Sequence, residues 1–228
     1  MGRSDQRSAD ARAAGATPVL RGYAHALAVL AAVLAGAHLL QVAHGDTALH
    51  VALLVYSASV VLLFAASALY HLGAWTPRQR AVVRRLDHAA ICAVIAGGYT
   101  PLAVAGLSGW GRLALPLSVW TLSGGAMATV TLHPTLSRSA RIAVYGGVML
   151  CALAASIGLL GHLGRGSVLL LGLSSGLCAL GGLVYASRRP VLWPRVFGFH
   201  EVFHLVVIAA NAVFYLVVLQ QSGTGPPA

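Results

Sequence analysis

Residues 48–73 read ALHVALLVYSASVVLLFAASALYHLG, a run of 26 positions without a single Asp, Glu, Lys or Arg. A helix needs about 20 mostly apolar residues to cross the hydrocarbon core of a bilayer, so this stretch is long enough to span a membrane. Similar apolar runs recur along the chain, at 22–43, 87–107, 113–132, 142–162, 167–186 and 196–219. The sequence therefore predicts an all-α, polytopic bundle of seven transmembrane helices.

The composition excludes most other classes of protein. Of the 228 residues, 58% are hydrophobic and 9% are charged, whereas ordinary soluble domains carry roughly 25% charged residues. Three cysteines are too few for a disulfide scaffold in a chain of this length. A membrane β-barrel would need strict alternation of apolar and polar residues, which these runs lack.

The formal net charge of +10 comes from arginines placed between the apolar runs, not from a patch suited to nucleic acid. Thirteen of the fifteen arginines lie on one side of the predicted membrane, and only Arg112 and Arg165 lie on the other. Since cytoplasmic loops are enriched in basic residues, this places the N-terminus in the cytoplasm and the C-terminus outside. We expect a cytoplasmic N-terminal segment at 1–21, a transmembrane domain at 22–219 and a flexible tail at 220–228.

Few polar side chains interrupt the predicted spans, and each is a candidate for function because ionisable groups inside a membrane are costly. Ser67 and His71 stand near the end of the second span, Asp87 starts the third, and His200 and His204 stand early in the seventh. With the topology above, all five lie at one depth near the cytoplasmic side. Such convergence from three distant segments predicts a single site.

The spacing of these residues indicates a metal. His200 and His204 are four residues apart and share one helix face, and Ser67 and His71 repeat that spacing. Three histidines with a fourth position left to water are typical of catalytic zinc. We therefore predict Zn²⁺ bound by His71, His200 and His204. Asp87 is predicted to hydrogen-bond the zinc-bound water and act as general base, and Ser67 to hold the water or a substrate carbonyl.

Other interpretations of the same residues stay open. The histidines can merely bridge helices by hydrogen bonds, and Asp87 can form an ion pair with Arg84 or Arg85. Residues 200–204 also read H-E-x-x-H, the signature of zinc proteases, in which Glu201 would be the base.

Two further histidines lie near the predicted site. His25, near the inner end of the first span, can lie behind the metal ligands, but we expect an interfacial residue and leave its role open. His88 follows Asp87 and points about 100° away from it on the helix, so its role is left open.

Four motifs are similar to those of the hemolysin III branch of the progestin and adipoQ receptor family: SALYH at 67–71, RLDH at 85–88, GYTP at 98–101 and FGFHEVFH at 197–204. The resemblance covers the chain from Arg21 to about Leu219. It implies a seven-helix bundle in the bacterial plasma membrane with a cytoplasmic N-terminus. It also implies zinc bound by His71, His200 and His204, with Asp87 and Ser67 beside it.

The resemblance also implies a function. Receptor members of that family are linked to ceramidase-type amide hydrolysis, and bacterial members carry the hemolysin name. We expect a zinc-dependent hydrolase acting on a membrane lipid such as a ceramide or another acyl amide or ester. The alternatives are a non-enzymatic sensor or hemolytic protein with structural zinc, and an intramembrane metalloprotease. The sequence leaves the oligomeric state open.

Overall fold

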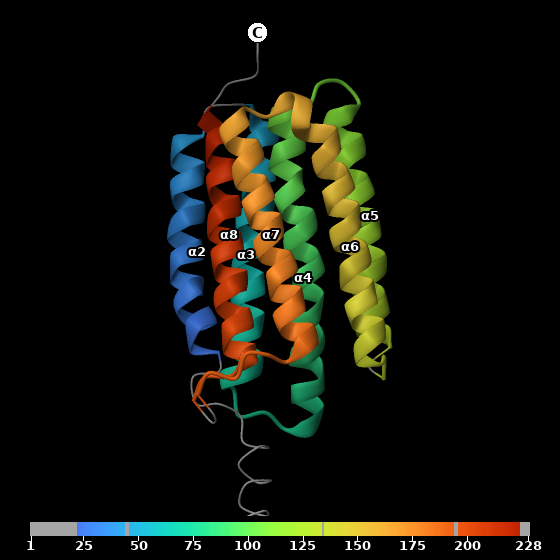
Figure 1. Ribbon diagram of the computed structural model, residues 1–228. Helices are drawn as coiled ribbons and strands as arrows, with labels where there is room; N and C mark the ends of the chain where they lie inside the picture. Colours follow the sequence, from blue (N-terminus) through green and yellow to red (C-terminus); the bar gives the residue numbers. More distant parts are fainter. Residues whose placement is uncertain (1–21, 44–45, 134, 194–195, 224–228) are drawn as a thin grey trace, which may run out of the picture.

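The computed structural model describes residues 22–43, 46–133, 135–193 and 196–223, and these residues form one bundle of long helices (Figure 1). Seven helices within the described ranges are long and apolar enough to cross a membrane, and no strand occurs there. They are α2 (Tyr23–Val42), α3 (Thr47–Leu72), α4 (Pro77–Gly106), α5 (Gly111–Leu132), α6 (Arg138–Leu159), α7 (Arg165–Ser187) and α8 (Phe199–Gly223). The predicted seven-helix architecture is confirmed.

Helix α4 begins ten residues before the predicted start of its span, at Pro77 instead of 87. Thr76 and Gln79 form a capping box, in which each side chain accepts a hydrogen bond from the other residue's backbone N–H. Pro77 occupies the first helical position, where its missing N–H costs nothing. Hydropathy marks only the apolar part of a helix, so it missed these basic first turns.

Helix α8 ends at Gly223. Residues 220–223, which we expected to belong to a flexible tail, are therefore helical, and Ser222 is only 1% exposed. The expected cytoplasmic segment 1–21 and the final residues 224–228 lie outside the described residues.

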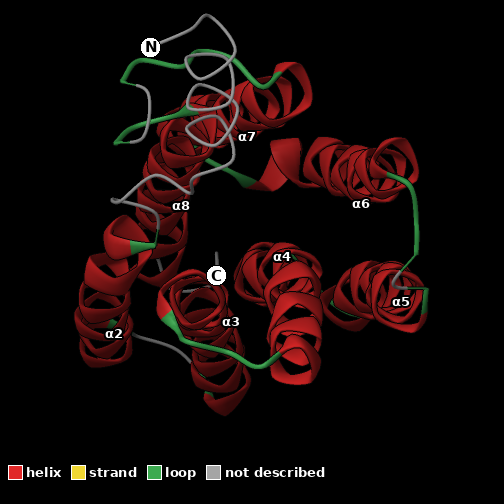
Figure 2. Cartoon of the chain, turned by 90° about the horizontal axis from the view of Figure 1, so that it is seen from below, coloured by secondary structure: helices red, strands yellow, loops and turns green. Residues whose placement is uncertain are grey.

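Helix α4 occupies the middle of the bundle and packs against α3, α5, α6 and α8, while α2 packs against α3 and α8 (Figure 2). Small residues bring α3 and α4 close together. A Cβ atom placed on Gly97 would lie 2.3 Å from the Ser59 Oγ, so only glycine permits this approach. The helices α2, α4, α6 and α8 all begin at one end of the bundle, here called the inner end, and its assignment to the cytoplasm stays a prediction.

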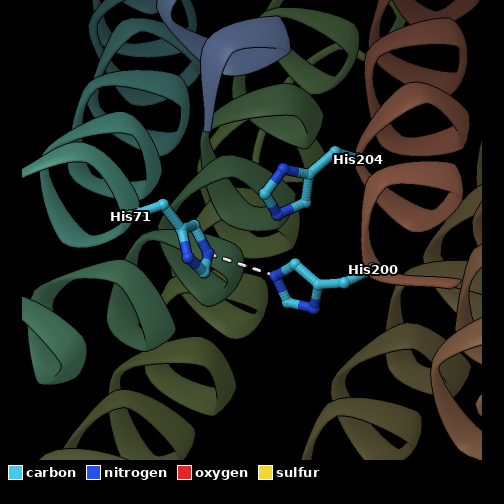
Figure 3. A group of neighbouring side chains, drawn as sticks. All are labelled: His71, His200 and His204. Carbon is cyan, nitrogen blue, oxygen red and sulfur yellow. Dashed lines mark hydrogen bonds between the residues drawn. The ribbon is translucent and has the colours of Figure 1, made fainter. Parts of the chain in front are cut away.

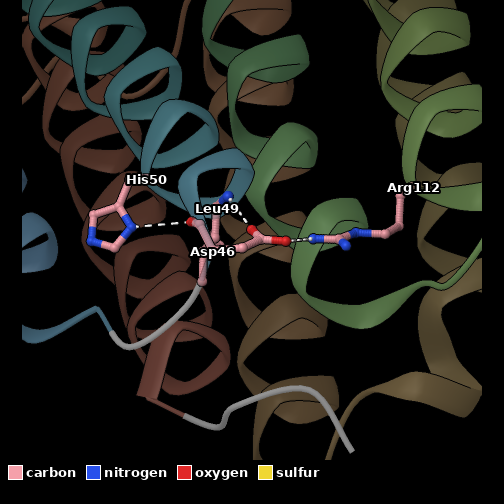
Figure 4. A network of polar contacts seen from close by, with 4 residues as sticks. All are labelled: Asp46, Leu49, His50 and Arg112. Carbon is pink, nitrogen blue, oxygen red and sulfur yellow. Dashed lines mark hydrogen bonds and ion pairs between the residues drawn. The ribbon is translucent and has the colours of Figure 1, made fainter.

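A polar network joins three segments at the opposite end (Figure 4). The Asp46 carboxylate caps α3 by accepting the Leu49 N–H at 2.9 Å, and it also accepts a hydrogen bond from the Arg112 guanidinium at 2.9 Å. The Leu49 N–H and then Arg112 hold the pKa of the Asp46 carboxyl below its ordinary value. The network links the connection before α3 to the first turn of α5.

Candidate metal centre

Three histidines from two helices meet near the inner end of the bundle (Figure 3). His71 stands in the last turn of α3, and His200 and His204 stand in the first two turns of α8. The Nε2 atoms of His71 and His200 are 3.1 Å apart, and one ring nitrogen from each histidine lies within 4.8 Å of the others. His204 is 2% exposed. The predicted convergence of the three imidazoles is confirmed.

The geometry and chemistry of this cluster fit a transition-metal ion. Tetrahedral zinc with Zn–N bonds of about 2.0–2.1 Å requires nitrogens about 3.3 Å apart. The longest separation exceeds this by about 1.5 Å, a distance that small rotations of the side chains can close. Imidazole nitrogens suit zinc, copper, iron and nickel. The cluster is therefore a possible metal site, and zinc as its occupant stays a prediction.

Two further predicted site residues, Ser67 and Asp87, lie close to each other. Ser67 is buried, one helical turn before His71 on α3, and its hydroxyl lies close to the Asp87 carboxylate on α4. Asp87 does not belong to the group of three histidines. In the described part of the chain, no ion pair joins Asp87 to Arg84 or Arg85. This placement is compatible with a base held next to the metal, a role that stays a prediction.

Glu201 faces the start of its own helix. It is 3% exposed, and its Oε2 accepts the Gly198 N–H at 2.7 Å. A carboxylate in the first turn of a helix satisfies an otherwise unpaired N–H and is favoured by the positive end of the helix dipole. This capping contact gives Glu201 a structural role, and the protease interpretation stays a prediction.

His25 differs from expectation. The structure buries it, at 3% exposed, and stacks its ring on that of His204, with centroids 3.9 Å apart and planes inclined by 13°. The residue before the helix brings this end of α2 close to α3. Gly22 has φ +90° and sits so close to α3 that a Cβ atom there would lie 2.8 Å from the His71 Cβ. The depth that grouped the other histidines applies equally to His25 and could have identified it.

His88 belongs to another contact. Its ring lies edge-on to that of Tyr145 on α6, with centroids 6.4 Å apart, and its carbonyl accepts a hydrogen bond from the Tyr145 hydroxyl at 3.5 Å. The ring therefore neighbours α6, and His88 is not a member of the histidine cluster.

Comparison with known proteins agrees with this architecture. The family model described as haemolysin-III related matches residues 14–215. The chain is also similar to Hemolysin-3 from Bacillus cereus, with 30% identity over 184 residues, which cover 77% of either chain. Together with the seven apolar helices, these matches fit a multi-pass membrane protein. The chain belongs to the haemolysin-III related family.

Proposed function

We propose that this protein is a zinc-dependent hydrolase that cleaves the amide or ester bond of a membrane lipid such as a ceramide. The observation that carries the proposal is the meeting of three imidazoles near one end of an apolar bundle. Ser67 stands one helical turn before His71, and the Asp87 carboxylate lies close to Ser67. Three neutral nitrogen ligands leave a zinc ion one open position, as catalytic sites require and structural sites do not.

The residues divide the chemistry between them. His71, His200 and His204 would hold the metal, which when bound supplies a Lewis acid and lowers the pKa of a coordinated water. Asp87 accepts a proton from the attacking water and returns it to the departing amine or alcohol. The Ser67 hydroxyl, which lies close to Asp87, would orient that carboxylate. The products are a fatty acid and the amine or alcohol of the lipid.

The surroundings of the site favour a lipid over a soluble substrate. The cluster is built on helices α3 and α8, both of which are apolar enough to span a membrane. A carbonyl that reaches it from the bilayer travels with its acyl chain, which apolar helices can accommodate. We infer that the substrate is an acyl lipid of the same membrane.

The test uses pure protein in detergent and a long-chain ceramide. We expect release of fatty acid, and Asp87→Asn should lower the rate by about 10²-fold or more because a general base contributes 10²–10⁴-fold, while zinc content is unchanged. Glu201→Gln is the matched control and should keep activity within a few fold. Full activity of Asp87→Asn, or loss of activity only in Glu201→Gln, would contradict the proposal.

A second candidate, perturbation of membranes with zinc in a structural role, is favoured by the name of the relative Hemolysin-3. It predicts that the protein releases dye from lipid vesicles without hydrolysing any lipid. It also predicts that loss of zinc from the His71, His200 and His204 triple variant unfolds the bundle. Vesicle leakage measured alongside fatty-acid release separates the two functions.

A further inference from the structure

Three arginines stand on α4 and α6 at the inner end of the bundle, the end that Figure 2 shows. Arg84 and Arg85 precede His88 by four and three residues, so the three side chains share one face of α4. That face is turned towards α6, because the His88 ring lies edge-on to the Tyr145 ring. Arg141 stands four residues before Tyr145 on α6. Both Arg84 and Arg141 lie within electrostatic range of the His88 ring, so the arginines gather one helical turn from that ring contact.

These arginines have no carboxylate partner in the part of the chain that the structure describes. No ion pair there involves Arg84, Arg85 or Arg141. Asp87 is the only acid on α4, and its carboxylate lies close to Ser67 on α3. Helices α5, α6 and α7 contain no acid at all. Like charges that gather in this way repel one another, and a bound anion would remove the repulsion.

Two of the arginines also carry donors without an acceptor. The Nε atoms of Arg85 and Arg141 are buried and make no hydrogen bond within the described residues. The Nη1 atom of Arg141 donates to the Leu136 carbonyl at 2.6 Å, which leaves the edge formed by Nε and Nη2 for another acceptor. Two parallel N–H groups on one edge match two oxygens of a phosphate group. Because buried polar groups nearly always have a partner, these donors point to a bound anion.

Two other arginines at the same end of the bundle differ from these three. Arg138 donates a hydrogen bond to the Tyr185 carbonyl, and its guanidinium lies 5.1 Å from the centre of the Tyr185 ring. The Arg80 guanidinium lies 5.2 Å from the centre of the Tyr70 ring. Their charges are therefore held against aromatic rings of the protein, whereas Arg84, Arg85 and Arg141 stand together without such a contact.

The surface beside the three arginines is apolar. Val82 and Leu86 on α4 are exposed, and so is Leu132 at the end of α5, a few residues before α6 begins. Arg84 and Arg85 stand just before the apolar part of α4, which is the depth of the lipid headgroups. A phospholipid places its phosphate group at this depth and its acyl chains against the exposed apolar side chains, which a soluble phosphate does not do.

We propose that Arg84, Arg85 and Arg141 bind the phosphate group of an anionic phospholipid between α4 and α6. Arg141 contacts the phosphate through its Nε–Nη2 edge, and Arg85 contacts it through its buried Nε. The bound phosphate neutralises the arginines and joins α6 to the centre of the bundle. The site is separate from the three clustered histidines and does not depend on the proposed function.

Native mass spectrometry of the protein in detergent tests the site, with dioleoyl phosphatidylglycerol as the probe. We expect one lipid molecule to bind more tightly than any others. Arg85→Gln and Arg141→Gln should each weaken this binding at least about tenfold, as the loss of a charged hydrogen bond predicts. Arg165→Gln is the matched control, since it removes the same charge from an exposed arginine at the opposite end of the bundle. Equal affinity of Arg141→Gln and Arg165→Gln would overturn the proposal.

Arg141→Lys keeps the proposal testable if Arg141→Gln fails to fold. Lysine retains the charge but lacks the planar pair of donors, so the affinity should still fall several-fold. Unchanged affinity of Arg141→Lys would contradict the contact through the Nε–Nη2 edge.

Two competitors identify the chemistry of the ligand. Dioleoylglycerol has the same acyl chains without a phosphate group and should not displace the probe. Glycerol 3-phosphate has the phosphate group without the chains and should displace the probe only weakly. Displacement by dioleoylglycerol as effective as by unlabelled phosphatidylglycerol would overturn the phosphate site. Equal displacement by glycerol 3-phosphate would assign the site to a soluble phosphate and overturn the phospholipid as its ligand.

Discussion

Zinc added to the purified protein should raise its melting temperature, and His204→Ala should abolish the rise. His204 is one of the three clustered histidines, so its loss would leave only His71 and His200 to hold an ion. Each protein serves as its own reference, because the shift is measured between metal-free and zinc-loaded samples. Any loss of packing caused by the substitution itself therefore cancels.

The size of the shift follows from mass action. At a zinc concentration of 100 times the dissociation constant, zinc that binds only the folded state raises the free energy of unfolding by about 2.7 kcal/mol. For a chain of 150–250 residues, the melting temperature changes by about 2–4 °C for each kcal/mol of stability, so we expect it to rise by about 5–11 °C. If losing one ligand lowers affinity at least 100-fold, the same zinc concentration contributes only about 0.4 kcal/mol, or less than about 2 °C.

The assay is thermal unfolding in detergent after chelation and after zinc addition. His133→Ala is the control, since His133 is exposed and lies outside the cluster, and it should retain the full rise. A rise of wild-type size in His204→Ala, or no rise in the wild type at saturating zinc, would refute the assignment of these imidazoles as ligands.

Two further predictions concern the bundle. Gly97→Ala should destabilise the bundle by about 1–3 kcal/mol, because the added Cβ would lie 2.3 Å from the Ser59 Oγ and 2.8 Å from the Ser59 Cβ. Gly146→Ala is the control: a Cβ added there has no heavy atom within 4 Å, so this variant should be neutral or slightly stabilising. Equal thermal midpoints for the two variants would contradict this packing argument. Leu49 and Arg112 lower the pKa of the Asp46 carboxyl in the folded protein. The ionised carboxylate should therefore stabilise the fold, relative to Asp46→Asn, in full at pH values above the ordinary aspartate pKa of about 3.9. This stabilisation should disappear as the pH falls through the lowered pKa of the folded protein. Thermal midpoints of both proteins between pH 7 and pH 3 test this, and a gap that is constant with pH would exclude it.

The sequence was sufficient for the architecture because membrane spans depend on length and hydropathy, which are local properties. It also brought His71, His200 and His204 together, since helix direction and position along each span fix depth. Length, hydropathy and depth do not specify which neighbour a side chain faces, because that depends on how each helix is rotated and packed. The facing of His25 depends on how α2 packs against α8, and the start of α4 at Pro77 depends on a cap outside the apolar run. The contact of Glu201 with the N–H of Gly198 likewise could not be predicted from the motif at 200–204.

The two helices that supply the imidazoles are far apart in the chain: His71 and His200 are separated by 129 positions. During synthesis, α3 enters the bilayer before α8, which follows only after four intervening helices have been made. The histidine cluster is therefore incomplete until α8 has been made. Truncated or stalled products would carry a lone His71 and would have no cluster with which to capture metal.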